Sequence, residues 1–271
     1  MSTADDPSGQ DDGQVLIERA GAVATLTLAR PSALNAMTWT MYEQLETHVR
    51  TLASDQDVRA IILRGQGTRA FAAGTDIRQF ATFSGADGVA YERRIDRIMD
   101  LLTSLPQPLI AAVQGYAVGG GLALVAACDL RYASADARFG IPVARTLGNC
   151  LSLRNYQRLG QAFGLMRAKE MLFTGHLLSA DEALRAGFLT AIVDEEDVFA
   201  RAREVAEQIS QNAPLTLWAT KEAFHRLGAA TNAALAQVAF DDVITRVYDS
   251  ADFHEGVRAH GEKRKPEWEG R

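Results

Sequence analysis

The sequence predicts an α/β fold of stacked strand–helix units, followed by a helical C-terminal region. Short runs rich in β-branched residues alternate with amphipathic helical segments up to about residue 162. Glycine clusters stand where a strand gives way to a helix. Beyond residue 162 nearly every segment has helical periodicity. A chain of 271 residues suits one large domain with such a helical appendage.

The N-terminal part consists of a polar stretch, a hairpin and a helix. The first residues, MSTADDPSGQDDG, lack the basic start and apolar centre of a signal peptide, and they predict a disordered tail over 1–13. Residues 15–18 and 23–29 favour strands, and the Ala-Gly pair between them favours a turn. Thr38 is typical of a helix N-cap, because apolar residues follow it at helical spacing.

The middle of the chain repeats the order strand, glycine turn, helix. Residues 58–63 predict a buried strand, and 71–77 (FAAGTDI) predict a short strand that runs into a turn. A helix is expected over 86–105, where prolines end it. The strand 109–113 then leads through three consecutive glycines into a helix over 120–128, and LRYAS predicts a further strand.

The C-terminal part is expected to be helical apart from one strand in FLTAIVD. The expected helices cover 198–211, 214–227, 232–248 and 252–262. We interpret the chain as a core of stacked units over 14–200 and a helical region over 201–271. This region is expected to pack on the core or on another subunit.

Composition and charge exclude several classes of function. The net charge is −6, whereas a duplex-binding surface needs clustered Lys and Arg, so no nucleic-acid partner is expected. Two cysteines are too few for a disulfide framework or a metal cluster, which favours a reduced, cytoplasmic setting. The five histidines do not have metal-ligand spacing, so no metal site is expected. No run of about 18 apolar residues predicts a membrane-spanning helix.

Two glycine-containing turns offer backbone N–H groups for chemistry. FAAGTD (71–76) ends a strand, and the glycine run (119–121) begins a helix, where N–H groups are free and the helix dipole is positive. If two N–H groups converge, they form an oxyanion hole, worth about 2.7–4 kcal/mol per donor. The alternative is that the glycines serve only close packing. Dinucleotide, P-loop and nucleophile-elbow motifs are absent.

These motifs carry a resemblance to a known family. AFAAGTDI and GYAVGGGLAL, together with RPSALNAM, CDLRYASADARFGIP, APLTLWATKEAF and EGVRAHGEKRKPEW, resemble the crotonase superfamily, which includes enoyl-CoA hydratases and isomerases. The likeness spans about 14–268. It implies a spiral of ββα units with a C-terminal helical trimerisation region, assembled as a homotrimer or hexamer. It also implies an acyl-CoA substrate and no cofactor besides the coenzyme A that the substrate carries.

The resemblance assigns roles to particular residues. The N–H groups of Ala73 and Gly120 are expected to hold the thioester oxygen as it becomes enolate-like. The turn that matches the CoA contact comprises Ala73, Gly74, Thr75 and Asp76, with Asp76 more an anchor of the turn than a catalytic group. Arg69 stands beside the expected CoA, and Lys263 matches a position that reaches a neighbouring subunit's CoA. The alternative for Lys263 is a solvated terminal charge run.

The chain departs from the family at its acid–base pair. Hydratases of the family use two glutamates to activate water and to deliver a proton. Here Ala123 and Val143 occupy those positions, and a third placement used by some isomerases aligns loosely with Ser152. Three outcomes are open: another residue has taken over, the reaction differs, or the protein binds acyl-CoA without turnover.

The segment 144–155 is the place to look for replacement groups. Arg145 is suited to hold an acyl carboxylate or polar group, and Asn149 to position water. Cys150 qualifies as a nucleophile only if its pKa is lowered. The plainer interpretations are an ion pair for Arg145, a turn for Asn149 and a small buried hydrophobe for Cys150. Tyr91 and Asp96 lie on a helix that often borders the acyl pocket, although YERRIDR is more typical of a solvated face.

The sequence therefore predicts an enzyme of the enoyl-CoA hydratase/isomerase type that acts through a stabilised enolate. Its reaction is expected to be non-standard: isomerisation, decarboxylation or C–C cleavage. A non-catalytic acyl-CoA binding protein is the second hypothesis. The third is an oligomeric scaffold in which the glycines serve only packing.

Overall fold

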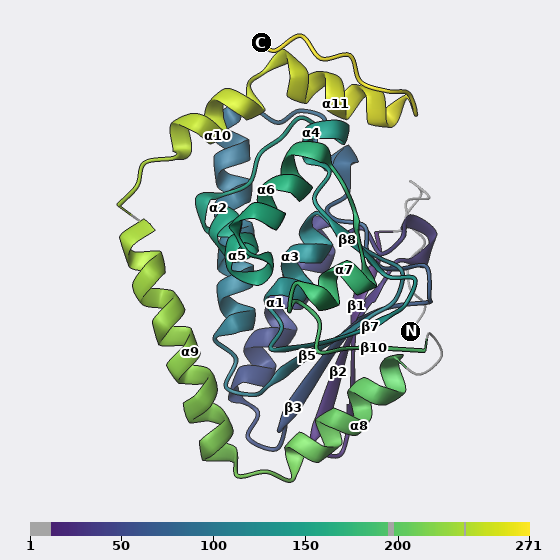
Figure 1. The fold of residues 1–271 in the computed structure, drawn as a ribbon, viewed down its shortest axis with the longest axis vertical. Helices are drawn as coiled ribbons and strands as arrows, with labels where there is room; N and C mark the ends of the chain where they lie inside the picture. Colours follow the sequence, from purple (N-terminus) through teal and green to yellow (C-terminus); the bar gives the residue numbers. More distant parts are fainter. Residues whose placement is uncertain (1–11, 195–197, 236) are drawn as a thin grey trace, which may run out of the picture.

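The protein is built on two stacked sheets with helices around them (Figure 1). The computed structural model describes residues 12–194, 198–235 and 237–271. The larger sheet has the order β1-β2-β3-β5-β7-β10. Its strands are β1 (Gln14–Ala20), β2 (Val23–Ala29), β3 (Ala60–Gly65), β5 (Leu109–Val113), β7 (Leu130–Ser134) and β10 (Ala191–Val193). The expected hairpin is the antiparallel pair of β1 and β2, and all the other pairs are parallel.

The smaller sheet has the order β4-β6-β8-β9. Its strands are β4 (Ala70–Ala72), β6 (Tyr116–Val118), β8 (Arg138–Gly140) and β9 (Leu178–Ser179). Three successive units send one strand to each sheet: β3 with β4, β5 with β6, and β7 with β8. Each pair precedes helical chain. The expected spiral of ββα units is therefore confirmed.

Helices fill the space around the sheets and begin where the sequence provides caps. The helices up to the end of the spiral are α1 (Trp39–Ser54), α2 (Gly85–Thr103), α3 (Gly120–Ala126), α4 (Val143–Thr146), α5 (Leu153–Phe163), α6 (Leu165–Thr174) and α7 (Ala180–Arg185). Two 3-10 turns, η1 (Pro31–Ala33) and η2 (Ile77–Phe80), link strands to helices. The Thr38 side chain accepts a hydrogen bond from the Met41 N–H, so the predicted N-cap of α1 is confirmed.

The apolar core lies in two layers on either side of the larger sheet. Alternate side chains of β3 separate them: Ile61 and Leu63 face α1, α2 and α3, whereas Ala60 and Ile62 face the opposite side. Helix α8 (Val198–Ser210) covers that opposite face with Val198, Ala202, Val205 and Ala206. The parallel strands β2, β3 and β5 are thus buried on both faces, whereas the antiparallel edge strand β1 is largely exposed.

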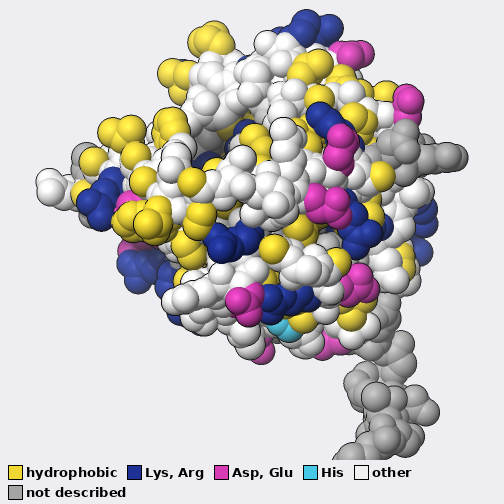
Figure 2. All heavy atoms as spheres, turned by 90° about the horizontal axis from the view of Figure 1, so that it is seen from below, with side chains coloured by type: hydrophobic (Ala, Val, Ile, Leu, Met, Phe, Trp, Pro, Cys, Tyr) yellow, Lys and Arg dark blue, Asp and Glu magenta, His cyan; other side chains and the backbone are white. Residues whose placement is uncertain are grey.

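The C-terminal helices leave the body and return to it. In Figure 1, α9 (Pro214–Leu235) runs alongside the molecule, and α10 (Asp241–Tyr248) and α11 (Ala251–Gly261) pack back near one end of α2. Apolar residues on α9 are exposed, and Figure 2 shows hydrophobic side chains gathered on this side of the molecule. The large exposed apolar residues of α9 are Leu215, Trp218, Phe224 and Leu227.

The helix boundaries in this region differ from the expectation. The predicted helices 214–227 and 232–248 are instead α9, which continues to Leu235, and a short α10 from Asp241. The gap expected between these two helices, at 228–231, was wrong, because α9 runs through it. A Cβ at Gly228 would meet nothing within 4 Å, and the alanine-rich sequence that follows favours helix.

Several short elements were not expected from the sequence. Strands β6, β8 and β9 have two or three residues each, which is too short for alternation to be visible. Of the expected tail 1–13, residues 1–11 lie outside the described part of the chain. Asp12 already contacts the core, because its backbone oxygen accepts a hydrogen bond from Thr38 (2.7 Å). In the described residues, every helix is too short or too polar to cross a bilayer.

Candidate active site

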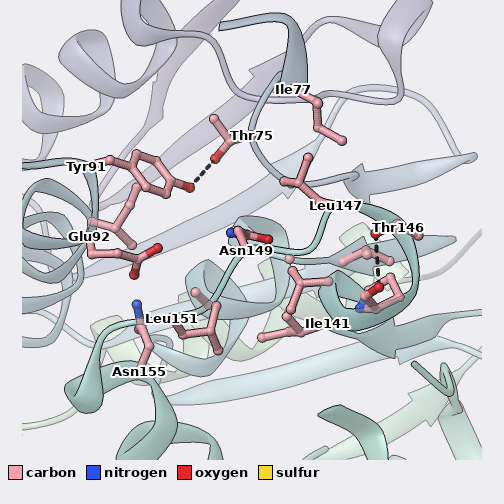
Figure 3. A pocket seen from close by; sticks show the side chains of 18 of the residues that line it. Thr75, Ile77, Tyr91, Glu92, Ile141, Thr146, Leu147, Asn149, Leu151 and Asn155 are labelled. Carbon is pink, nitrogen blue, oxygen red and sulfur yellow. Dashed lines mark hydrogen bonds between the residues drawn. The ribbon is translucent and has the colours of Figure 1, made fainter. Parts of the chain in front are cut away.

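A cavity of about 100 Å³ lies between α2, α3 and the chain that leads from β8 into α5. Its wall is largely apolar, and several polar side chains point into it from different elements (Figure 3). The polar side chains on the wall belong to Thr75, Tyr91, Glu92, Thr146, Asn149, Asn155 and Arg158. The two glycine-containing turns of the sequence both reach this cavity. They therefore serve one site, as the sequence predicts.

The amides that face the cavity are those of Thr75 and Gly120. A Cβ built on Gly120 would lie 3.7 Å from Thr75 N, and one built on Gly74 would lie 3.6 Å from Gly120 N. Within the described residues, neither amide donates a hydrogen bond. The Met37 N–H donates to Gly74 O, and the Asp76 N–H donates to Met37 O. These two hydrogen bonds flank Thr75, so the Thr75 N–H points away from Met37. Gly120 is the first residue of α3, where helical N–H groups are free.

The assignment of the Ala73 N–H to the oxyanion hole was wrong. That N–H donates to the Leu34 carbonyl at 3.0 Å, so it is already satisfied. Leu34 has a left-handed backbone (φ 52°) at the end of η1, which turns its carbonyl toward the strand end. The free amide is two residues further on, beyond Gly74, whose φ of 97° reverses the chain. Ala73 and Gly74 remain lining residues.

The three consecutive glycines have different tasks. Gly119 has a φ of 57°, which allows the sharp turn from β6 into α3. A Cβ on Gly121 would collide with the Ala72 carbonyl, so Gly121 permits close packing on β4. A Cβ on Gly120 would approach Thr75 and would lie 2.8 Å from Tyr42 Oη. The packing interpretation therefore holds for Gly121, whereas the oxyanion-hole interpretation of Gly120 stays a prediction.

Two tyrosines hold Thr75 in place. The Thr75 hydroxyl lies 2.8 Å from Tyr42 Oη and 2.8 Å from Tyr91 Oη. Burial raises the pKa of Tyr42 to about 12 and the pKa of Tyr91 well above its ordinary value. Both phenols are therefore neutral at physiological pH. The Thr75 amide is thus fixed before any ligand arrives, as preorganised stabilisation of an oxyanion requires.

Asp76 anchors the turn that presents Thr75. Its carboxylate accepts hydrogen bonds from buried Arg30 (2.9 Å) and from Arg78 (2.6 Å), and it caps η2 through the Arg78 N–H. Burial alone would raise the pKa of Asp76, but the hydrogen bonds from Arg78 and Arg30 outweigh it and hold the pKa at about 2. The two arginines occupy both carboxylate oxygens.

A buried glutamate that the sequence analysis did not single out faces the cavity. Glu92 on α2 is 2% exposed, and its carboxyl group points into the cavity in Figure 3. Its oxygens accept hydrogen bonds from Tyr248 Oη (2.9 Å) and from the Ser152 N–H (2.7 Å). Burial raises its pKa to about 8, although the hydrogen bonds from Tyr248 and Ser152 lower it. Glu92 is therefore largely protonated at neutral pH.

A chain of hydrogen bonds links Glu92 to the C-terminal helices. Asn149 Nδ2 donates to Tyr248 Oη (3.2 Å), whose own hydrogen goes to Glu92. Tyr248 lies at the end of α10 and reaches α2 because Gly88 has no side chain: a Cβ there would collide with the tyrosine ring. Asn149 Oδ1 is buried and has no partner in the described structure.

The remaining predicted residues divide between the cavity and the surface. Ala123 and Val143, which stand where the resemblance expects glutamates, both line the cavity. Asn149 lines it as well, whereas Arg145 does not: it is exposed and packs beside Gly175, so the suggestion that Arg145 holds an acyl group was wrong. Burial raises the pKa of Cys150 to about 12, which agrees with a buried hydrophobe and not with a nucleophile.

The other polar candidates lie behind or outside the cavity. Ser152 caps α5 and donates through its hydroxyl to Asp96 Oδ1 (2.8 Å), so these two residues support Glu92 without lining the cavity. The side chains of Arg69 and Lys263 are exposed. Their roles toward the phosphates of CoA remain predictions.

Stacked sheets in a ββα spiral, with two free amides at an apolar cavity, define the crotonase class of fold and site. The chain belongs to the enoyl-CoA hydratase/isomerase family, whose pattern matches residues 18–271. It is 33% identical to a short-chain-enoyl-CoA hydratase from Clostridium acetobutylicum, over 93% of this chain and 96% of that protein. It is also 33% identical to an (E)-benzylidenesuccinyl-CoA hydratase from Thauera aromatica, over 94% and 99%.

The solved structures that resemble this chain have the same fold over nearly its whole length. A methylmalonyl-CoA decarboxylase in complex with 2-nitronate-propionyl-CoA has a TM-score of 0.83 and 29% identity. The match covers 95% of this chain and 99% of that one. An enoyl-CoA hydratase/carnitine racemase from Magnetospirillum magneticum has a TM-score of 0.76 and 32% identity, covering 97% of each chain.

Proposed function

We propose that this protein binds an acyl-CoA thioester and stabilises its enolate with the N–H groups of Thr75 and Gly120. The observation that carries the proposal is the pair of free amides that face one cavity, with Thr75 fixed by two tyrosines. Donors aimed at developing charge in a water-poor site are the largest single contribution in many enzymes. The relatives named above act on CoA thioesters, which supports the same class of substrate here.

The rest of the cavity supports an acyl group as the ligand. Ile141, Leu147 and Leu151 provide apolar surface for a hydrocarbon chain. Asn149 Oδ1 is a buried acceptor without a donor, and a polar group of the ligand would satisfy it. Within the described lining, Arg158 is the one cationic side chain, and it already donates to Asn155 and lies 3.9 Å from Asp100. A neutral acyl group therefore suits the cavity better than a malonyl-type carboxylate.

The reaction that we propose is a proton shift within the acyl group, without addition of water. Hydration by two carboxylates needs both a base for water and an acid for carbon, and general acid–base catalysis contributes about 10²–10⁴-fold. The side chains of Ala123 and Val143 perform neither task. A 3-enoyl-CoA converts to a 2-enoyl-CoA through an enolate with one proton carrier, so isomerisation demands less of this site than hydration does.

Binding is the first test of the proposal. Titration with butyryl-CoA, hexanoyl-CoA and octanoyl-CoA is expected to release or absorb heat in a calorimeter and to raise the melting temperature, because a ligand of the folded state stabilises it. Free coenzyme A is the control for contacts outside the cavity. The absence of both heat and thermal shift with all three thioesters would refute the proposed function.

Hydration is expected to be negligible. Crotonyl-CoA incubated with the protein should lose its enoyl absorbance at no more than about a hundredth of the rate of a hydratase that has both glutamates. The double variant Ala123→Glu with Val143→Glu is expected to raise that rate, because both side chains line the cavity. Rapid hydration by the unmodified protein would show that the acid–base groups are assigned incorrectly.

The proposal extends to a homotrimer or hexamer of the chain. Exposed Leu215, Phe224 and Leu227 on α9 form an apolar surface that water does not favour. Between α9 and the body there is a groove of about 1170 Å³, bordered by Lys221 and by residues of α2 and α5. Packing of α9 against a further copy would remove this apolar surface from water.

A further inference from the structure

We propose that Glu92 is the catalytic acid–base residue of this site and carries the proton to and from the acyl group. The proposal rests on the proposed function, since it needs an acyl-CoA enolate in the cavity. It assigns to α2 a task that the resemblance places at the positions of Ala123 and Val143. The geometric basis is that Glu92 faces the same cavity of about 100 Å³ as the Thr75 and Gly120 amides.

No other lining group of the described cavity is suited to this proton transfer. Glu92 is its one carboxylic acid. The pKa of Tyr91 lies well above its ordinary value because of burial, so that phenol holds its proton at neutral pH. Arg158 has donors only and stays charged even where burial lowers its pKa. Thr75, Thr146 and the two asparagines do not titrate.

Two hydrogen bonds hold the carboxyl group of Glu92, and within the described residues no cationic side chain forms an ion pair with it. Its two oxygens accept from Tyr248 Oη and the Ser152 N–H, which are both neutral donors. A structural carboxylate buried in a protein is normally paired with a positive charge. Asp96 lies one helical turn further along α2, and the charge of this second acid disfavours a negative charge at Glu92. This environment suits a group that exchanges a proton.

The proposed step is balanced without water or an oxidant. The ionised Glu92 carboxylate takes the α-proton of a 3-enoyl-CoA. The electron pair of the broken C–H bond moves into the enolate, whose oxygen the Thr75 and Gly120 amides hold. Glu92 then returns the proton to the γ-carbon, where the π electrons of the β,γ double bond form the new C–H bond. The enolate oxygen re-forms the thioester carbonyl, the electron pair of the enolate carbon–carbon double bond becomes the α,β double bond, and the Glu92 carboxylate is regenerated. The product is a 2-enoyl-CoA.

The acidity of Glu92 gives this step a defined pH dependence. Its pKa of about 8 means that the base form increases as the pH rises through 8, so the rate with low substrate should rise and then level off. Several other titratable or charged side chains influence Glu92 or are influenced by it. They are Tyr42, Tyr91, Asp96, Cys150, Tyr156 and Tyr248, while Arg94 acts on Tyr42 and Arg158 on Asp96. The tyrosines and Cys150 titrate above this range, and burial raises the pKa of Asp96 from its ordinary value.

The substitution Glu92→Gln tests the proposal with little change of shape. The glutamine side chain keeps one oxygen that can accept a hydrogen bond from Tyr248 or Ser152. It has no carboxyl group that can take a proton from the substrate and return it. We expect isomerisation of 3-hexenoyl-CoA to 2-hexenoyl-CoA, and deuterium exchange at the α-carbon in D₂O, to fall at least about 100-fold. Binding of hexanoyl-CoA should stay within a few-fold of the unmodified protein. The residual isomerisation rate of Glu92→Gln should no longer increase as the pH rises through 8.

The matched control is Glu43→Gln, because Glu43 is an exposed glutamate on α1 that pairs with Arg94 at the surface. Its isomerisation rate and pH profile should equal those of the unmodified protein. If Glu92→Gln binds hexanoyl-CoA and isomerises or exchanges as fast as Glu43→Gln does, Glu92 does not carry the proton. If the unmodified protein binds thioesters but neither isomerises nor exchanges them, the proposal for Glu92 fails while binding stands. If it binds none, the proposed function itself fails.

A second variant distinguishes a catalytic carboxyl group from a structural one. Tyr248→Phe removes the hydroxyl that donates to Glu92 Oε1. That hydrogen bond lowers the pKa of Glu92, so its loss raises the pKa and moves the rising part of the pH profile to higher pH. A merely structural role predicts a lower melting temperature without displacement of the profile. An undisplaced profile in a folded Tyr248→Phe protein would overturn the proposal.

Discussion

Replacing Gly120 with alanine should abolish enolate chemistry while leaving the fold in place. The added methyl group would lie 3.7 Å from Thr75 N and 2.8 Å from Tyr42 Oη, so it would crowd the amide and the tyrosine that hold Thr75 in place. Loss of a single donor of this kind costs about 10²–10³-fold in turnover. Because the methyl group would displace the Thr75 amide from its place beside the Gly120 amide, we expect at least a 100-fold loss of deuterium exchange into hexanoyl-CoA in D₂O.

The control for this variant is Gly160→Ala. Gly160 lies in α5, where a Cβ meets nothing within 4 Å, so alanine there should leave exchange unchanged and slightly raise the melting temperature through helix propensity. Circular dichroism should show both variants folded. Exchange by Gly120→Ala within a few-fold of Gly160→Ala would mean that the oxyanion lies elsewhere.

Replacing Asp76 with alanine should have the largest effect on stability. The change removes the carboxylate partner of Arg30, a residue that is 3% exposed, together with the cap of η2. Breaking a buried pair from one side costs about 3–5 kcal/mol. Urea unfolding should report a loss in this range. The turn that presents the Thr75 amide should loosen at the same time.

Acid provides an internal check on the effect of Asp76. Its pKa of about 2 in the folded protein lies below the ordinary value, so its contribution is fully present above pH 4 and is lost as the pH falls toward 2. The stability difference between the unmodified protein and Asp76→Ala should therefore shrink over that interval. Asp57→Ala is the control, because Asp57 is exposed and its pair with Arg19 spans 3.5 Å. A loss for Asp76→Ala no larger than that for Asp57→Ala would contradict the role of Asp76.

The sequence predicted the architecture because the signals for it are local. The capped helix at Thr38 and the buried strand 109–113 depend on neighbouring residues alone, and the structure contains both. The free amide lies two residues from the one expected, at Thr75 and not at Ala73, and the sequence did not show this for a different reason. Which N–H is free depends on the Leu34 carbonyl, 39 residues away in the sequence, and on a reversal at Gly74.

Glu92 was missed because its sequence surroundings are charged. YERRIDR is typical of a solvated face, yet one stripe of this helix is buried. Gly88, Glu92, Ile95 and Met99 recur at intervals of three and four residues, which is the spacing of a core-facing stripe. That spacing was visible beforehand. What the sequence did not reveal is that Tyr248, 156 residues later, closes over this stripe.

The dependence of Glu92 on Tyr248 has a consequence for biosynthesis. A chain that leaves the ribosome folds from its N-terminal side, so the spiral, both amides and α2 are complete long before α10 is made. Until α10 docks, Tyr248 neither covers this glutamate nor donates to it, so its carboxyl group is more open to water than in the folded protein. The environment that raises the pKa of Glu92 is therefore complete only when the last helices are in place.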